Sequence, residues 1–216
     1  MLNKLFGIFA IALFIGGALR AEKINLPAPS GAEMSVHKAI AERRSRRTFT
    51  AKEISQTQLS EILWAADGIT DPNGRFRSAP SAGATYPIDT YVLVQRVTGI
   101  EPGVYKYIEK DNALELLRKG DFAKQLTDAA LGQTMINDAS VTIGLFGVYE
   151  RTTKKYGERG KQYVHFEIGH IGENVYLVAE ALGLATCAIG AFYDDKVQDV
   201  FGIKSVPLYL LPVGTR

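Results

Sequence analysis

The sequence has little with which to bind a soft metal or form a covalent cross-link. Its 216 residues include one cysteine, Cys187, and three histidines. A single cysteine excludes an internal disulfide and leaves the redox compartment undecided. His165 and His170 are five residues apart, whereas two ligands on one helix face need a spacing of four. We therefore expect no metal site.

A strong excess of one charge is also missing. The chain has 25 basic and 23 acidic residues, a formal net charge of +2. Proteins that hold nucleic acid by bulk electrostatics are far more basic, so we expect no nucleic-acid partner, and any anion site must be local. Three common signatures are absent as well: the GxGxxG dinucleotide turn, the GxxxxGK[ST] phosphate loop and the GxSxG nucleophile elbow.

The first 21 residues differ from the rest. Lys4 precedes an apolar run over 5–15, about the length of a signal-peptide core and too short to span a bilayer easily. Small residues follow, up to Ala18 and Ala21, as at cleavage sites. We predict a signal peptide over 1–21 and an exported, periplasmic protein with no stable membrane span after leader removal. The alternative is a buried N-terminal helix.

The remainder predicts a linker over 22–34, rich in proline and glycine, and one domain over 35–216. Helices are expected after the capping residues Ser35 and Ser55, after Asp121, over 163–182, and after Asp194 or Asp195. Strands are expected over 90–97, 103–108, 113–117, 141–149, 185–189 and 206–213. This order predicts an α+β fold, a central mixed β-sheet flanked by helices, with a long core helix.

The densest charge on the chain is the segment Arg43-Arg44-Ser45-Arg46-Arg47. Arginine offers planar, bidentate donors that match a phosphate monoester, and Ser45 adds a hydroxyl. The alternative is a solvated helix end, where cations favour the negative end of the helix dipole.

Two further segments could approach a flat ligand. The loop over 78–87 is rich in small residues, which let a backbone come close to a ring. The segment over 188–195 leaves a strand and enters a helix, a turn that offers backbone N–H groups. An ordinary surface loop and a plain connector are the alternatives.

Together these segments resemble the nitroreductase-like FMN flavoproteins, in their SagB-type branch. Arg-Arg-Ser-Arg-Arg-Thr-Phe over 43–49 looks like the RRSxRxF signature, and Pro-Ser-Ala-Gly-Ala-Thr-Tyr-Pro over 80–87 like the PSAGxxYP loop. Residues 163–184 resemble the core helix of that branch, and 189–192 its flavin-edge loop. The resemblance covers about residues 35 to 216 and implies a nitroreductase-like fold, an FMN cofactor and a homodimer.

The resemblance also implies roles for individual residues. The FMN phosphate or ribityl chain would be held by Arg43, Arg44, Ser45, Arg47 and Arg216. The isoalloxazine ring would lie along Ser81, Ala82 and Gly83. Its edge would meet Ile189, Gly190 and Ala191, with the Gly190 N–H facing flavin N5.

At the substrate side, Lys155 and Tyr156 resemble a catalytic Lys-Tyr pair of azoline-oxidising relatives; the alternative is a polar helix start. The expected activity is electron transfer between a donor and a flat small-molecule acceptor, nitro- or quinone-like. Two alternatives stay open: a SagB-type dehydrogenase that oxidises a substrate ring, and a non-catalytic flavin-binding relative.

Overall fold

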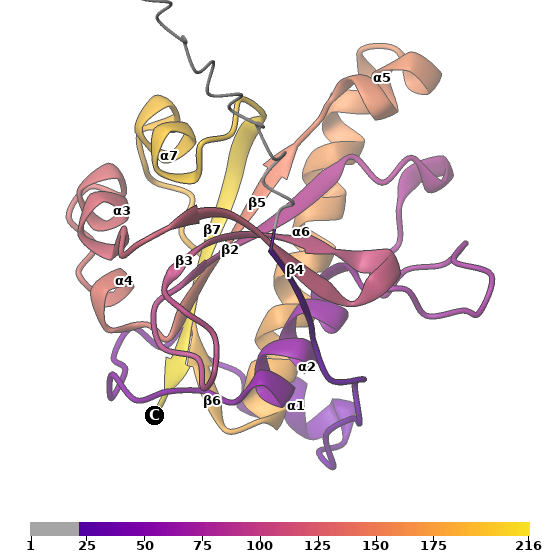
Figure 1. Cartoon of the computed structure of the whole chain (residues 1–216). Helices are drawn as coiled ribbons and strands as arrows, with labels where there is room; N and C mark the ends of the chain where they lie inside the picture. The colour runs from indigo at the N-terminus through magenta and orange to yellow at the C-terminus, as the bar shows by residue number, and fades with distance from the viewer. Residues whose placement is uncertain (1–21) are drawn as a thin grey trace, which may run out of the picture.

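The computed structural model describes residues 22–216, so the predicted signal peptide over 1–21 lies outside the described residues. Seven strands form one sheet in the order β1-β4-β3-β2-β5-β7-β6 (Figure 1). The strands are β1 Lys23–Asn25, β2 Ile88–Val94, β3 Gly103–Ile108, β4 Ala113–Lys119, β5 Val141–Gly147, β6 Leu184–Thr186 and β7 Val206–Thr215.

The helices are α1 Val36–Glu42, α2 Gln56–Asp67, α3 Ala123–Ala129, α4 Met135–Asp138, α5 Glu150–Tyr156, α6 Arg159–Ala181 and α7 Asp194–Phe201, with 3-10 turns η1 Ala82–Ala84 and η2 Glu109–Asp111.

Every ladder between named strands is antiparallel. Parallel pairing occurs in isolated bridges such as Ser45 with Thr186, so the expected mixed character of the sheet comes from these bridges alone. The α+β class is confirmed. No helix within residues 22–216 has the length and apolarity needed to cross a bilayer.

Alternation along the strands places helices on both faces of the sheet. In β2, Val92 and Val94 belong to one core cluster with α2 and α6, whereas Tyr91 and Leu93 belong to a second cluster with α3, α4 and α7. Successive side chains of a strand point to opposite faces, so a strand that is apolar throughout needs cover on both. The result is a three-layer arrangement, visible in Figure 1.

Two of the predicted helix starts are confirmed at atomic detail. The Ser35 side chain accepts the Lys38 N–H, and Ser55 forms a capping box with Gln58. These side chains satisfy N–H groups that a helix start leaves unpaired. At α7 the prediction was wrong, because Tyr193 is the N-cap and the two aspartates lie in the first turn.

The segment 22–34 is not the linker that its prolines predicted. Residues 23–25 form β1, which pairs with β4, Ile24 opposite Leu114. Further along, the Ser30 and Gly31 N–H groups donate to the buried Glu61 carboxylate, the latter at 2.7 Å. The prolines and glycine predict bends in this segment. Its partners, β4 and Glu61, are far away in the sequence, so the sequence pattern does not reveal them.

Candidate functional site

The arginine segment begins where α1 ends, and Tyr176 of α6 ties it to the loop after β6. The Tyr176 hydroxyl accepts the Ala188 N–H at 2.7 Å and lies 2.8 Å from Ser45 Oγ. Either hydroxyl can donate in this contact, because each has one proton and lone pairs that accept. When Tyr176 donates, the Ser45 hydroxyl proton is free to reach another acceptor. The Arg43 guanidinium lies over the Tyr176 ring, 5.6 Å from its centroid.

The arginines of this segment differ in what they bind. Arg44 donates to the Ala41 carbonyl at 3.0 Å and the Arg43 carbonyl at 2.7 Å. It therefore closes the end of α1, which agrees with the alternative interpretation of this segment as a helix end. Arg46 pairs with the buried Glu180 at 3.4 Å. Arg43 and Arg47 have no acidic partner within residues 22–216. They are the arginines available to an anion.

Arg216 lies near this cluster but is engaged elsewhere. Its guanidinium pairs with Glu180 at 2.7 Å and donates to the Leu184 carbonyl at 2.9 Å. Glu180 therefore pairs with both Arg46 and Arg216, and its single negative charge offsets one of their two positive charges. Arg216 fixes the end of β7 against α6, and an anion would have to compete with Glu180 for it.

The structure brings the two predicted catalytic residues to the predicted ring loop. Lys155 Nζ donates to the Gly83 carbonyl at 3.3 Å. Gly83 has φ +60°, and a Cβ there would overlap both the Tyr156 hydroxyl and the Lys155 ammonium group. Glycine is thus required by the backbone conformation and by the close approach. The Tyr156 ring packs edge-on against Tyr163 with centroids 5.1 Å apart.

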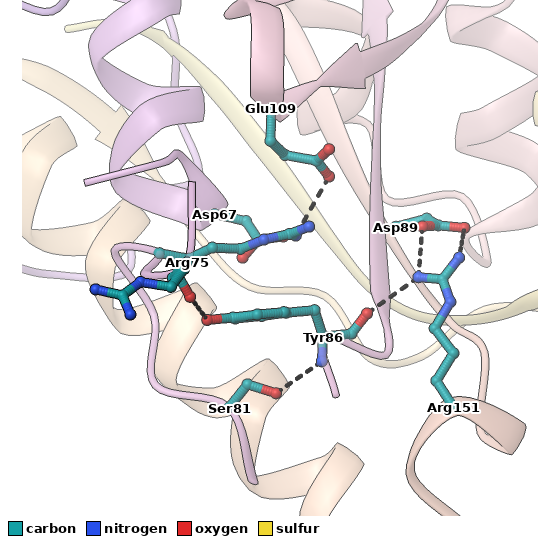
Figure 2. A network of polar contacts seen from close by, with 8 residues as sticks. Asp67, Arg75, Ser81, Tyr86, Asp89, Glu109 and Arg151 are labelled. Carbon is teal, nitrogen blue, oxygen red and sulfur yellow. Dashed lines mark hydrogen bonds and ion pairs between the residues drawn. The ribbon is translucent and has the colours of Figure 1, made fainter. Parts of the chain in front are cut away.

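The same loop contains strained backbone. Ala84 has φ +53° and Tyr86 φ +43°, left-handed conformations that cost an L-residue roughly 1–2 kcal/mol each. Side-chain contacts hold the loop in place. The Tyr86 N–H donates to Ser81 Oγ at 2.9 Å, and the Tyr86 hydroxyl donates to the Arg75 carbonyl at 2.7 Å (Figure 2). Arg151 donates to the Tyr86 carbonyl at 3.0 Å. Strain that the surroundings hold in place is common at ligand sites.

A buried ionic cluster anchors the loop from behind. Arg77 pairs with Asp67 of α2 and, at 3.4 Å, with Glu109 of η2. Its guanidinium also stacks on the Tyr86 ring, 4.4 Å from the centroid. Burial raises the pKa of Asp67, while the adjacent Arg77 opposes that shift. Figure 2 shows how Tyr86 lies between this cluster and the Arg151–Asp89 pair, which forms at 2.8 Å.

Glu167 is the ionisable residue that sequence reasoning missed. It is 3% exposed and lines a pocket with Pro80, Ser81, Ala82, Tyr163, Phe166 and His170. Burial raises its pKa to about 7, and the nearby Ser81 hydroxyl partly offsets this. A glutamate within an amphipathic helix pattern looks like a solvent-facing residue. Only the packing of the 80–83 loop onto α6 buries it.

The third predicted segment lies at the other end of the same helix. Ile189 pairs with Leu210 through hydrogen bonds of 2.8 and 3.0 Å, and Gly190 and Ala191 follow as exposed residues. A Cβ placed at Gly190 or at Gly172 of α6 would lie in van der Waals contact with the Tyr209 ring.

Helix α6 is the element that joins all three segments. It contacts the ring loop around Glu167 and the arginine segment at Tyr176, nine residues later, or about 13 Å along the axis at 1.5 Å per residue. Between them, Asn174 donates to the Ser78 carbonyl at 3.3 Å.

Cys187 is buried, and burial raises its thiol pKa, which disfavours the reactive thiolate. Within the described residues no three His, Cys, Asp or Glu side chains gather as a metal site.

Comparison with known proteins assigns the fold to a family. The model of the nitroreductase family matches residues 40–215. The chain belongs to the nitroreductase family. The resemblance inferred from the motifs is confirmed, and membership implies an oxidoreductase.

Two relatives show how far the similarity extends. A protein of Methanocaldococcus jannaschii that carries the name nitroreductase is 42% identical over 195 residues, 90% of this chain and 98% of that protein. The trifolitoxin operon protein TfxC of Rhizobium leguminosarum bv. trifolii is 27% identical over 211 residues. That match covers 90% of this chain but 59% of TfxC, so this chain spans little more than half of that relative.

Solved structures agree on the architecture. A protein of Ralstonia eutropha named as a nitroreductase has a TM-score of 0.77 at 25% identity and covers 89% of each chain. The Escherichia coli microcin synthetase McbBCD complex, with truncated pro-MccB17 bound, has a TM-score of 0.69 at 21% identity, over 98% of this chain and 84% of that chain. A Desulfovibrio desulfuricans protein in complex with FMN has a TM-score of 0.59 at 19% identity, over 84% and 86%. The last two establish the fold alone.

Proposed function

We propose that this oxidoreductase binds one FMN and passes electrons between a donor and a flat small-molecule acceptor, nitro- or quinone-like. The phosphate lies at the arginine segment and the ring along Ser81–Gly83. The observation that carries the proposal is the position of the Tyr176 hydroxyl. It holds the Ser45 hydroxyl beside Arg43 and Arg47, which have no acidic partner within residues 22–216, and it joins this anion site to the Gly190 turn.

The residues present fit the cofactor at both ends. Two guanidinium groups and the Ser45 hydroxyl suit a phosphate monoester, and the chain has no dinucleotide turn for a second nucleotide. Small residues at 82–84 leave the backbone open to a flat ring. The solved FMN complex of the Desulfovibrio desulfuricans protein supports this assignment, because it has the same fold.

When bound, FMN supplies hydride acceptance and donation at its ring. The protein contributes binding, orientation and proton positions. Arg43, Ser45 and Arg47 hold the phosphate. The exposed Gly190 turn presents a backbone N–H to the ring edge, where a donor stabilises negative charge. Lys155 and Tyr156 stand at the open side of the Gly83 turn, where a substrate would stack.

The test begins with the absorbance spectrum of the purified protein. We expect a yellow protein, or an apoprotein that takes up FMN in clear preference to FAD. Tight FAD binding without FMN binding would contradict the proposal. Anaerobic mixing with candidate donors and then acceptors follows, because a non-catalytic flavin binder would hold FMN without turning it over.

A second candidate activity is SagB-type dehydrogenation of a substrate ring. It is favoured by the contact of Lys155 with the Gly83 carbonyl at 3.3 Å, which places the Lys155 amino group beside the ring loop. Removing a proton while flavin takes a hydride needs such a base, whereas an acceptor under reduction can take protons from water.

We also propose a homodimer. Val36 and Ile40 of α1 are 68% and 56% exposed, and Phe166 of α6 is 49% exposed, although α1 and α6 pack against each other. Large apolar side chains on neighbouring helices are typical of a contact surface. Sedimentation that showed only monomer at micromolar concentration, with FMN bound, would count decisively against it.

We also propose that the protein is exported and that its signal peptide is removed. N-terminal sequencing of the natural protein tests this.

A further inference from the structure

The turn over 190–192 has backbone donors that the rest of the chain does not use. The N–H groups of Gly190, Ala191 and Phe192 form no hydrogen bond within residues 22–216. At its start the turn is anchored to β7, because Ile189 and Leu210 exchange two backbone hydrogen bonds. The Ile189 carbonyl therefore points at β7, and since the peptide bond that follows it is trans, the Gly190 N–H points away from β7.

The other end of the turn is anchored to the corner between α3 and α4, residues 129–133. The Tyr193 N–H donates to the Ala129 carbonyl at 2.9 Å, and the Gln133 side chain donates to the Ala191 carbonyl at 3.0 Å. The same Gln133 amide nitrogen donates to the Ala130 carbonyl at 3.0 Å. Because both acceptors are carbonyl oxygens, only the nitrogen end of the amide can face them. Its two protons are thus divided between the corner and the turn.

The corner has an unusual backbone, which precedes Gln133 directly. Leu131 and Gly132 have φ of +59° and +76°. The left-handed region is disfavoured for leucine, and the Leu131 side chain is 53% exposed, so its own burial does not explain the conformation. The Gly132 N–H donates to the Thr127 carbonyl at 2.9 Å, which closes the end of α3. Strained backbone that the surroundings hold in place is common at functional sites.

Gln133 fixes a peptide unit that nothing else in the turn restrains. Gly190 and Ala191 are exposed, and neither has a side chain that could hold the turn by packing. Within the described residues, Gln133 is the one side chain that forms a hydrogen bond with residues 190–192. It holds the Ala191 carbonyl towards the corner, so the Phe192 N–H of the same trans peptide points away from the corner. A half-turn of this peptide unit would present an oxygen in place of the N–H, and the neighbouring glycine leaves the backbone free to make it.

We propose that Gln133 is a positioning residue of the flavin site: it holds the Ala191 carbonyl at the α3–α4 corner and so keeps the N–H groups of the 190–192 turn available to the edge of the bound flavin ring. This inference rests on the proposed function, because it takes the ligand at the turn to be FMN. Donors at this edge stabilise the reduced ring, which is more negative than the oxidised ring. Gln133 therefore acts on the reduction potential of the flavin.

The test compares the midpoint reduction potential of FMN bound to the parent and to Gln133→Met, which keeps the length of the side chain and removes its donors. Gln133→Met should bind reduced FMN about threefold to tenfold more weakly relative to oxidised FMN, the size of one hydrogen bond. For two electrons this ratio corresponds to a potential lower by about 14–30 mV, at about 30 mV per factor of ten. A merely structural role would weaken both redox forms alike and leave the potential unchanged.

Gln95→Met is the matched control. The Gln95 amide also donates to two backbone carbonyls, those of Ile136 at 2.9 Å and Asn137 at 3.2 Å, but it does not bond to the turn. Gln95→Met should therefore keep the parental potential. A parental potential in Gln133→Met, or an equal fall in Gln95→Met, overturns the inference while FMN binding stands. A parent that binds no FMN contradicts the proposed function, and this inference fails with it.

Amide hydrogen exchange of the apoprotein tests the anchor without the cofactor. Tyr193 is the reporter, because its N–H is bonded to the corner two residues after the Gln133 contact. Its exchange should be about threefold to tenfold faster in Gln133→Met and parental in Gln95→Met. Unchanged exchange in Gln133→Met would show that Gln133 does not hold the turn, and would overturn the inference.

Discussion

The hydroxyl of Tyr176 lies 2.8 Å from Ser45 Oγ, a contact in which either group can donate, and it accepts the Ala188 N–H at 2.7 Å. One oxygen thereby sets the orientation of a serine on the arginine segment and holds the loop after β6. A single residue of α6 thus links two segments that are far apart in the sequence.

Tyr176→Phe should therefore weaken FMN binding by about threefold to tenfold, since it removes the hydrogen bond that holds the Ser45 hydroxyl and leaves the Ala188 N–H without its partner. The dissociation constant from fluorescence quenching measures this. Tyr105→Phe is a matched control, because its hydroxyl donates to the Glu101 carbonyl at 2.8 Å on another part of the sheet. Equal affinities in Tyr176→Phe and the parent would remove the assigned role of Tyr176.

The arginines of the segment should separate into two groups. Arg43→Ala and Arg47→Ala should each lose about 1.5–3 kcal/mol of FMN binding, roughly tenfold or more, as expected for a hydrogen bond to a charged group. Arg44→Ala should bind FMN nearly as the parent does, because Arg44 is engaged with the carbonyls at the end of α1. If all three variants bind alike, the phosphate lies elsewhere.

Gly83→Ala tests the turn that brings Lys155 and Tyr156 to the ring loop. The φ of +60° costs alanine about 1–2 kcal/mol, and the new methyl group must displace both side chains. We expect a lower free energy of unfolding by at least that amount and a marked loss of turnover. The comparison variant is Ala84→Gly, which relieves the left-handed conformation at φ +53° and should leave stability equal or higher. A Gly83→Ala protein as stable as the parent would contradict this geometry.

The stability of the protein should depend on pH through Glu167. Its pKa is raised from the ordinary 4.5 to about 7, so the folded state keeps a proton that the unfolded chain releases at lower pH. Stability from this group is full below about pH 4.5 and is lost as pH rises towards 7, by up to about 3 kcal/mol. Glu167→Gln removes this loss. Denaturant unfolding of both proteins at pH 5 and pH 8 should show a difference that grows with pH; a constant difference would show that Glu167 titrates normally.

Lys155→Ala and Tyr156→Phe distinguish the two candidate activities. If the enzyme dehydrogenates a substrate ring, each variant should lower turnover by about 10²-fold or more while FMN stays bound. If it reduces a nitro or quinone acceptor, both should stay near parental activity. We expect acceptor reduction. Substrate-dependent bleaching of the flavin under anaerobic conditions, lost in both variants, would reverse that expectation.

Local sequence signals located most elements and the segments of the site. Ser35 and the Ser55–Gln58 pair mark helix starts because their hydrogen bonds close within three residues. The long apolar pattern predicted α6, although the helix begins earlier, at Arg159. The three segments with small or basic residues do lie along one helix.

The contacts that organise the site could not be read in the same way, because each joins residues far apart in the sequence. The sequence pattern of α6 places Glu180 on the surface, whereas in the structure it is buried in ion pairs with Arg46 and Arg216. Arg216 was expected at the phosphate, and the structure shows it in an ion pair. Glu167 and Tyr176 carry no motif of their own. Their roles come from burial against loops that the helix pattern does not specify.

The position of strand β1 has a consequence for the folding of the chain. Lys23 pairs with Glu115, so β1 can dock only after the distant β4 has been made and placed, and such long-range pairings form late. Until then β4 presents unpaired backbone groups, a template for pairing with another molecule. A chain whose N-terminal end is still held by a ribosome-associated factor or a translocation pore therefore carries an aggregation-prone edge. Once docked, residues 23–25 pair with residues 113–115 and cover that part of the edge.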